Sequence, residues 1–353
     1  MFWNSNLHKA KDVKNDEFYT QLPDIENELR HYKEHFKWKT ILCNCDDPRV
    51  SNFFHYFAYN FEHLGLKRLI TTCYKNRNPD LFSLNNSESA VYLIYDWDKN
   101  WNNVPDMNEI WINELKWNWD FRSEECIELL KQADIVVTNP PFSLFREYVA
   151  ELIDYNKNFL VIWNQNAITY KEIFPLIKEN RLWLWFTHPK EFLVPNFDKT
   201  NKNTYIDDNW LKKAKFWNIC WYTNLDISKR HEELICYQSV KSSNYYKYEN
   251  YDAIDVNKVS EIPVDYEWAM WVPITFLDKY NPEQFEIIWC PDYTWLYGSD
   301  YMWVSRIWEK WINQYRKQWW TGHYTANMTS LVYFDETWKA CNTFKRILIR
   351  RKK

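Results

Sequence analysis

Glycine is almost absent from this chain of 353 residues, which contains only Gly65, Gly298 and Gly322. An average content of about 7% would give roughly 25 glycines. Tryptophan, usually one of the rarest residues, occurs 23 times. Three glycines are too few for a chain of this length, because its turns repeatedly need a residue that tolerates positive φ. Other residues therefore stand at turn positions.

Several tryptophans stand where turn sequences normally carry glycine. Asp-Trp and Asn-Trp pairs occur in 95–103 and 207–210, and glycine after Asp or Asn is a strong turn signal. In 266–276, glycine at Trp268 and Trp271 would give a glycine-spaced turn before a strand. Our hypothesis is that most of these tryptophans are glycine in the living protein, because a gene that uses UGA as a glycine codon was translated with UGA as tryptophan. The alternative is a truly tryptophan-rich protein that stacks on bases or binds carbohydrate.

Other absences narrow the class of protein. The mean hydropathy is −0.65 and no apolar run of about 18 residues is present, so we expect no membrane span. Residues 1–16 lack the apolar core of a signal peptide, which favours a cytoplasmic protein. Cys43 and Cys45 lack the second pair or the histidines that a zinc site needs, so we expect reduced thiols and no metal.

The net charge of −4 neither indicates nor excludes a nucleic-acid partner, because binding depends on a local basic face. The clearest basic cluster lies at 344–353, and a solvated tail is an equally good interpretation of it.

Helices and apolar strands alternate up to about residue 228. We expect helices at 24–36 (with Asp24 as its cap), 50–64, 123–132, 144–155 and 170–180, and strands at 39–48, 67–74, 133–142, 158–164, 182–186 and 216–224. Residues 75–118 show no strong period. This alternation predicts an α/β fold with a doubly wound, mostly parallel sheet. Beyond 229 the alternation is lost, so we expect two domains, 1–228 and 229–353.

The motif that indicates chemistry is Asn139-Pro140-Pro141-Phe142, at the end of the strand predicted at 133–142. The two prolines cannot donate hydrogen bonds, so a backbone carbonyl there is available as an acceptor. Asn139 adds a side-chain carbonyl, and Phe142 adds a flat apolar face. Two acceptors beside an aromatic ring suit the exocyclic amino group of a planar base. A proline turn that simply closes the strand is the alternative.

With this motif the chain resembles the EcoRI-type adenine-specific DNA methyltransferase family. The matching blocks are 16–36, 42–54, 120–148 and 164–180, and the resemblance extends over most of 7–280. It implies a Rossmann-like S-adenosylmethionine-dependent methyltransferase fold with a smaller C-terminal recognition region. It also implies that 1–228 is catalytic, that 229–353 recognises the target, and that Asn139, Pro140, Pro141 and Phe142 are catalytic. Family sequences carry glycine before Asp120 and at position 163, whereas Trp183 and Trp221 resemble true tryptophans of the family.

The same resemblance implies a set of cofactor-binding residues. Those residues are Phe18, Tyr19 and Thr20 in motif X, Asn44, Asp46 and Asp47 at motif I, and Asp120 and Phe121 in motif III. Two departures stand out: Ser51-Asn52 replaces the motif I glycine, and no acidic residue follows the second strand in 70–76. Asp46 and Asp47 as helix caps, and Phe121 as a core residue, remain open alternatives.

The resemblance implies transfer of a methyl group from S-adenosylmethionine to N6 of an adenine that is flipped out of double-stranded DNA, without a metal. Lys229, Arg230 and the 344–353 cluster are then candidates for phosphate contacts. We expect a nucleoid-associated protein, with a cognate restriction endonuclease encoded nearby rather than bound as a stable subunit. The alternatives are an RNA or protein-glutamine methyltransferase, and a non-catalytic DNA-binding module.

Overall fold

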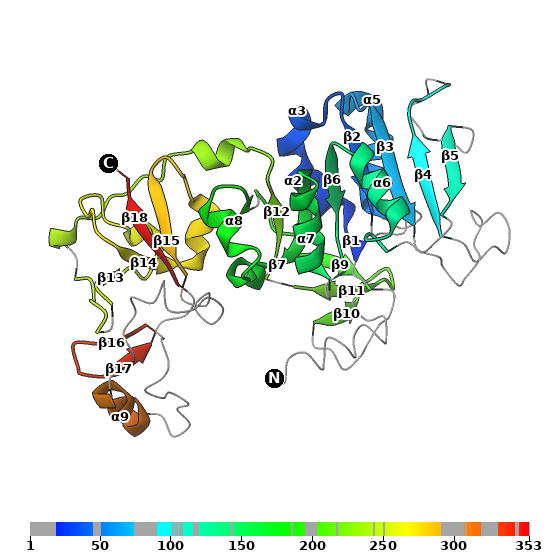
Figure 1. Cartoon of the computed structure of the whole chain (residues 1–353). Helices are drawn as coiled ribbons and strands as arrows, with labels where there is room; N and C mark the ends of the chain where they lie inside the picture. Colours follow the sequence, from blue (N-terminus) through cyan, green and yellow to red (C-terminus); the bar gives the residue numbers. More distant parts are fainter. Residues whose placement is uncertain are drawn as a thin grey trace. The chain divides into compact units, whose positions relative to one another are not determined.

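The computed structural model divides into two compact units, which are described separately (Figure 1). The described residues are 19–44, 51–73, 90–100, 102, 105, 109–115, 120–141, 144–184, 186–194, 203–216, 218–242, 244–249, 251–290, 307, 309–318, 331–342 and 346–352. The first unit takes its described residues from Met1–Asn166 and Trp183–Leu225, and the second from Ala167–Leu182 and Asp226–Lys353. The catalytic and recognition domains expected at 1–228 and 229–353 stay a prediction. Residues 167–182, which the sequence grouped with the first domain, belong to the second unit.

An eight-stranded mixed sheet lies at the centre of the first unit, in the order β5-β4-β3-β2-β6-β7-β12-β8. Its strands are β2 (Thr40–Cys43), β3 (Arg68–Cys73), β4 (Val91–Tyr95), β5 (Ile110–Glu114), β6 (Ile135–Thr138), β7 (Asn158–Asn164), β8 (Trp183–Leu184) and β12 (Ile219–Thr223). The helices of this unit are α2 (Leu22–Leu29), α3 (Lys33–Phe36), α4 (Asn52–Tyr59), α5 (Phe61–Leu64), α6 (Glu124–Gln132) and α7 (Phe145–Asp154). All residues of β2 and β6 are buried, as expected for central strands with both faces covered.

The order of the four central strands reverses between β2 and β6. The chain runs from β2 through α4 and α5 to the parallel strand β3, and later from β6 through α7 to the parallel strand β7 on the other side. Because both crossovers are expected to be right-handed, α4 and α7 cover opposite faces of the sheet. Figure 1 shows α6 and α7 together in front of the sheet. The doubly wound centre is therefore as predicted.

The prediction of a mostly parallel sheet is wrong for the outer strands. β4 pairs antiparallel with β3 and β5, and β12 pairs antiparallel with β7 and β8. The sequence also missed β4 and β5, which lie within 75–118. Their residues are mostly half-exposed or exposed, and Trp111 and Ile112 face solvent to 61% and 47%. With apolar side chains on both faces, these strands lack the alternation that marks a half-buried strand.

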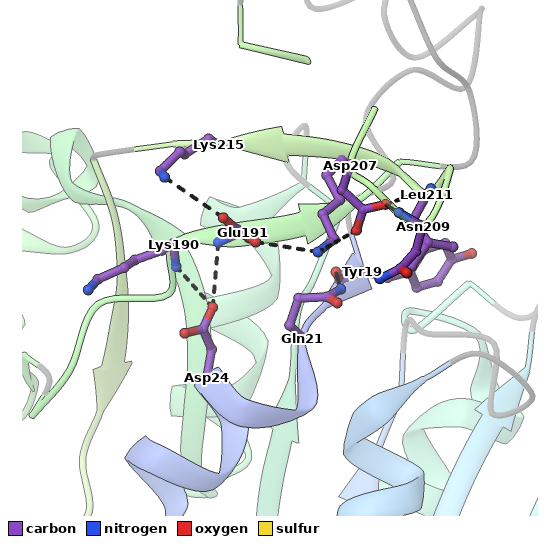
Figure 2. Close-up of polar contacts among 10 residues, drawn as sticks. Tyr19, Gln21, Asp24, Lys190, Glu191, Asp207, Asn209, Leu211 and Lys215 are labelled. Carbon is purple, nitrogen blue, oxygen red and sulfur yellow. Dashed lines mark hydrogen bonds and ion pairs between the residues drawn. The ribbon is translucent and has the colours of Figure 1, made fainter. Parts of the chain in front are cut away.

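A small antiparallel sheet holds the first described residues, in the order β1-β9-β11-β10. Its strands are β1 (Tyr19–Thr20), β9 (Glu191–Leu193), β10 (Thr204–Ile206) and β11 (Lys212–Lys215). Glu191 forms ion pairs with Lys213 at 3.5 Å and with Lys215 at 3.8 Å. Lys213 also pairs with Asp207 at 2.9 Å. Figure 2 shows how this network lies beside Tyr19.

The assignment of Asp24 as a helix cap is wrong. Helix α2 begins at Leu22, with Gln21 as its N-cap and a proline in the first turn, a favoured place for proline. The Asp24 carboxylate instead accepts hydrogen bonds from the backbone N–H of Lys190 at 3.0 Å and of Glu191 at 3.5 Å (Figure 2). Asp24 therefore ties α2 to the small sheet.

A second acidic residue of α2 is fully buried. The Glu28 carboxylate accepts from the backbone N–H of Phe186 at 2.9 Å, from the N–H and hydroxyl of Thr187 at 2.5 and 2.7 Å, and from the Tyr32 hydroxyl at 2.9 Å. Burial raises the pKa of Glu28, and these hydrogen bonds oppose the rise. A buried carboxylate is tolerated when donors surround it in this way. Glu28 thus fixes α2 against the loop that precedes β9.

The second unit contains a four-stranded sheet, a hairpin and the helix α9. Its elements are α8 (Phe174–Lys178), β13 (Ile254–Asp255), β14 (Met270–Pro273), β15 (Phe285–Trp289), α9 (Glu309–Gln318), β16 (Val332–Phe334), β17 (Ala340–Asn342) and β18 (Arg346–Arg351). The sheet order is β13-β14-β18-β15, and β16 pairs with β17. None of the described helices combines the length and apolar character needed to cross a lipid bilayer.

The glycine-spaced turn expected in 266–276 is only partly correct. Trp268 precedes β14 and is 74% exposed, whereas Trp271 lies inside β14 and is fully buried. The Trp271 ring packs edge-on against Trp289 at a centroid distance of 5.5 Å. Residue 271 is therefore a core strand position, because β14 is paired on both sides by β13 and β18.

Candidate active site

Two asparagines end the strands on either side of the point where the sheet order reverses. Asn44 follows β2 and Asn139 follows β6, and the residues are only 7% and 6% exposed. The Thr138 hydroxyl donates a hydrogen bond to the backbone carbonyl of Asn44, which ties the two strand ends together. In open α/β sheets, ligands bind beyond the carboxyl ends of the strands at such a switch point. The fold therefore brings Asn44 and Asn139 together where a ligand is expected.

Tyr148 on α7 connects two predicted site residues, and the sequence did not identify it. Its hydroxyl donates to Oδ1 of Asn44. Its ring meets the ring of Phe121 edge-on, with centroids 5.0 Å apart. Both aromatic residues are buried, so Phe121 packs inside the unit. One feature of the sequence could have pointed to Tyr148: it lies on the first two turns of the helix that follows the Asn-Pro-Pro-Phe motif.

The Asp120 carboxylate is held by Arg122, a residue that the sequence pattern did not single out. Arg122 donates to both carboxylate oxygens, from Nε at 2.9 Å and from Nη2 at 2.7 Å. Arg122 also donates from Nη1 to Glu147 on α7 at 2.8 Å. The pKa of the Arg122 guanidinium is raised, mainly by its hydrogen bonds to Asp120. Such exposed pairs add little stability, but two parallel bonds fix the orientation of the carboxylate.

Glu151 lies one turn further along α7 and has an unusual ionisation. Partial burial, followed by the negative charge of Asp120, raises the pKa of the half-buried Glu151 carboxyl to about 7. The nearby positive charge of Arg122 opposes this rise. A carboxyl group that titrates near neutral pH beside a predicted cofactor residue makes this end of α7 sensitive to pH.

Strand β1 places Tyr19 and Thr20 against the start of α4. Tyr19 pairs with Leu193 and Thr20 with Phe192 of β9. The side-chain amide of Asn52 donates to the Thr20 carbonyl at 2.7 Å, so the segment predicted as motif X lies directly beside the end of the predicted motif I. The Thr20 hydroxyl is buried and has no hydrogen-bond partner among the described residues. A buried hydroxyl of this kind is a candidate ligand contact.

The remaining predicted residues are described only in part. Pro140 and Pro141 follow Asn139, and the Pro141 carbonyl accepts from the backbone N–H of Leu144 at 3.0 Å, which leads the chain into α7. Phe18, Asp46, Asp47 and Phe142 lie outside the described residues. Within the described part of the chain, no group of three or more His, Cys, Asp or Glu side chains is placed to hold a metal ion.

Four of the six described basic side chains proposed for phosphate contacts are ion-paired in the second unit. Lys229 pairs with Asp278 at 2.5 Å, and Arg230 with Asp226 at 3.6 Å. In β18, the buried Arg346 pairs with Asp255 at 3.3 Å, and Arg350 pairs with Glu286 at 2.7 Å. The described part of the 344–353 cluster is therefore an integral strand of the sheet rather than a solvated tail.

Comparison with known proteins identifies the family. The model described as "Adenine-specific methyltransferase EcoRI" matches residues 6–352. The chain is 50% identical over 291 residues to the Type II methyltransferase M.EcoRI of Escherichia coli, which covers 81% of this chain and 89% of that protein. It is 41% identical over 293 residues to M.MgeORF184P of Mycoplasma genitalium, with 81% and 86% covered. No solved structure matches the chain. With a match over nearly its whole length, the chain belongs to the EcoRI family of adenine-specific DNA methyltransferases.

Proposed function

We propose that this enzyme transfers a methyl group from S-adenosylmethionine to N6 of adenine within a specific duplex DNA sequence. The observation that carries the proposal is the position of Asn139-Pro140-Pro141 at the carboxyl end of β6, beside Asn44 at the end of β2. On this proposal the first unit is a Rossmann-like methyltransferase domain, and the second unit recognises the target.

The cofactor site is proposed at the ends of β1 and β2 and the start of α6. It comprises Tyr19, Thr20, Asn44, Asp120 and Phe121, together with Phe18, Asp46 and Asp47 from the sequence. Three features fit S-adenosylmethionine: the buried Thr20 hydroxyl without a partner, the oriented Asp120 carboxylate, and the aromatic ring next to it. A carboxylate accepts from the adenine amino group, and an aromatic ring packs on the adenine face. When bound, the cofactor supplies an electrophilic methyl group.

The role of Asn139 follows from its acceptor oxygen and its burial. The side-chain carbonyl of Asn139 and a backbone carbonyl of the adjoining proline turn accept hydrogen bonds from the two protons of the adenine amino group. These hydrogen bonds stabilise the positive charge that develops on the amino group in the transition state, and they are stronger where water is excluded. N6 forms the bond to the methyl carbon as the carbon–sulfur bond breaks, and N6 then releases one proton to solvent.

The target adenine must leave the double helix, because N6 is paired inside the duplex. Flipping a base costs a few kcal/mol, which contacts to the DNA backbone and grooves must offset. We assign these contacts to the second unit and the stacking of the flipped base to Phe142. Because three relatives carry Type II methyltransferase names, we also propose that a restriction endonuclease is encoded near this gene.

Transfer of label from tritiated S-adenosylmethionine tests the proposal. We expect label in duplex DNA as N6-methyladenine, and none in RNA or protein. Asn139→Ala should lower the rate of transfer at least 100-fold, because it removes an acceptor that acts in the transition state, while cofactor affinity changes little. Label found mainly in RNA or protein, or full activity in the Asn139→Ala variant, would overturn the proposal.

A further inference from the structure

Helix α9 presents a polar face that no other described part of the second unit covers. Figure 1 shows α9 beside the β16–β17 hairpin. Trp311 and Ile312 are buried against this hairpin, and the Trp311 indole N–H donates to the Tyr333 carbonyl at 3.0 Å. The exposed residues of the helix are Glu309, Lys310, Asn313, Arg316 and Lys317. The helix is thus anchored on one side and turns three cations and one carboxylate outward.

Three basic groups elsewhere in the unit are already neutralised by carboxylates. Lys229, Arg346 and Arg350 are each paired with a carboxylate at 3.3 Å or less. Lys317 has no ion pair with any described residue, and Lys310 lies 4.6 Å from the centre of the Trp338 ring. An exposed lysine without a carboxylate partner among the described residues complements a polyanion.

The spacing on α9 matches a double helix. Lys310, Asn313 and Lys317 are separated by three and four residues, so they line one face of the helix. At about 1.5 Å per residue, the two lysines are about 10 Å apart along the axis. The DNA major groove is about 12 Å wide, and asparagine forms paired hydrogen bonds with the N6 and N7 edge of adenine. An asparagine between two lysines therefore suits a base edge between two phosphate backbones.

We propose that α9 enters the major groove of the target DNA, with Asn313 directed at base edges and Lys310 and Lys317 at phosphates on either side. This inference rests on the proposed DNA methyltransferase function and adds to it the element that reads the sequence. Among the described residues of the second unit, α9 is the only helix of more than six residues, so no other helix there extends far enough to reach across the groove.

The experiment compares Asn313→Ala and Lys317→Ala with Lys258→Ala, a matched control. Lys258 is an exposed lysine of the same unit that pairs with Glu261 at 3.2 Å. Wild-type protein first methylates plasmid DNA, and mapping of N6-methyladenine defines the target site. A duplex with this site then serves to measure Kd at several KCl concentrations, and duplexes with each base pair replaced give the sequence preference. Thermal unfolding and cofactor titration verify that each variant is folded.

We expect Asn313→Ala to lose about tenfold or more discrimination at one base pair, with an unchanged salt dependence. Lys317→Ala should lower the slope of log Kd against log salt by about 1, with an unchanged sequence preference. Lys258→Ala should change neither. If folded Asn313→Ala keeps the wild-type preference at every position, or Lys317→Ala keeps the wild-type slope, the role of α9 is refuted while the proposed function stands. If wild-type protein transfers no methyl group to DNA, both fail.

Discussion

Trp38, Trp210 and Trp338 all have φ of 60°, a backbone conformation that a bulky residue rarely adopts. Trp210 and Trp338 occupy matching hairpin turns. In each turn the tryptophan N–H donates to the carbonyl of an aspartate three residues earlier, Asp207 or Asp335. In such loops a residue in the left-handed region follows a type I turn, and that position favours glycine.

Trp38 stands in a different turn with the same requirement. Lys37 has φ −59° and ψ 124°, and the Lys39 N–H donates to the Phe36 carbonyl at 3.0 Å. These angles describe a type II turn, whose third residue needs positive φ and is normally glycine. Trp38 and Trp210 are also 73% and 85% exposed. The backbone thus favours the hypothesis that these positions are glycine in the living protein.

Replacement of Trp210 by glycine tests this at one residue. We expect Trp210→Gly to stabilise the fold by up to about 1 kcal/mol. Relief of the left-handed conformation contributes about 1–2 kcal/mol, and the extra freedom of glycine in the unfolded chain removes about 0.4–1 kcal/mol. Urea unfolding measures the difference.

Trp183→Gly is the matched control, because the Trp183 indole N–H donates to the Leu225 carbonyl at 2.5 Å. That variant should lose roughly 3 kcal/mol or more. Equal losses in the two variants would show that position 210 has no preference for glycine.

At the scale of elements, α7 connects the motif that precedes it to β2 and to the loop before α6. The connection depends on Tyr148, whose hydroxyl donates to Asn44 and whose ring contacts Phe121. In Tyr148→Phe the ring remains and the hydrogen bond is lost. Because a buried hydrogen bond contributes about 1 kcal/mol, affinity for S-adenosylmethionine should fall about three- to tenfold, as measured by calorimetric titration.

Tyr155→Phe provides the comparison for this prediction. Tyr155 is the C-cap of the same helix, and none of its described contacts involves Asn44 or Phe121. Its replacement should leave the affinity unchanged. An unaltered affinity in Tyr148→Phe would indicate that the hydroxyl does not position Asn44 for the cofactor.

At the scale of the whole molecule, Glu151 makes the unfolding free energy depend on pH. The folded protein keeps the proton of this carboxyl up to about pH 7, whereas the unfolded chain releases it near the ordinary pKa of 4.5. The folded state therefore loses stability as pH rises from about 4.5 to about 7. Glu151→Gln should be more stable than wild type by about 1 kcal/mol at pH 8, because solvent screening reduces the effect for a half-exposed group.

Urea unfolding at pH 5 and pH 8 measures this difference, which should nearly vanish at pH 5. Glu62→Gln, a change at an exposed position on α5, should shift the unfolding free energy equally at both values. A Glu151→Gln variant with the same stability change at pH 5 and pH 8 would contradict the prediction.

Local patterns predicted the central strands of the first unit but not which distant segments join them. The alternation of strands and helices predicted β2, β3, β6 and β7, because a buried parallel strand is a continuous apolar run. It did not predict that 167–182 joins the second unit, or that β4 and β5 extend the sheet. Those outcomes depend on packing between distant segments, which local patterns do not record.

The sequence alone determined the family and the place of Asn139, since a proline pair after an apolar strand is a local pattern and long matching blocks are specific. Only the tertiary structure decided what surrounds these residues. Tyr148 meets Asn44 across 104 positions of the chain, and Glu28 meets Thr187 across 159. It also decided that Arg346 is a buried partner of Asp255 rather than a phosphate contact. The sequence determines the charge of each side chain, but only the folded structure determines which group that side chain pairs with.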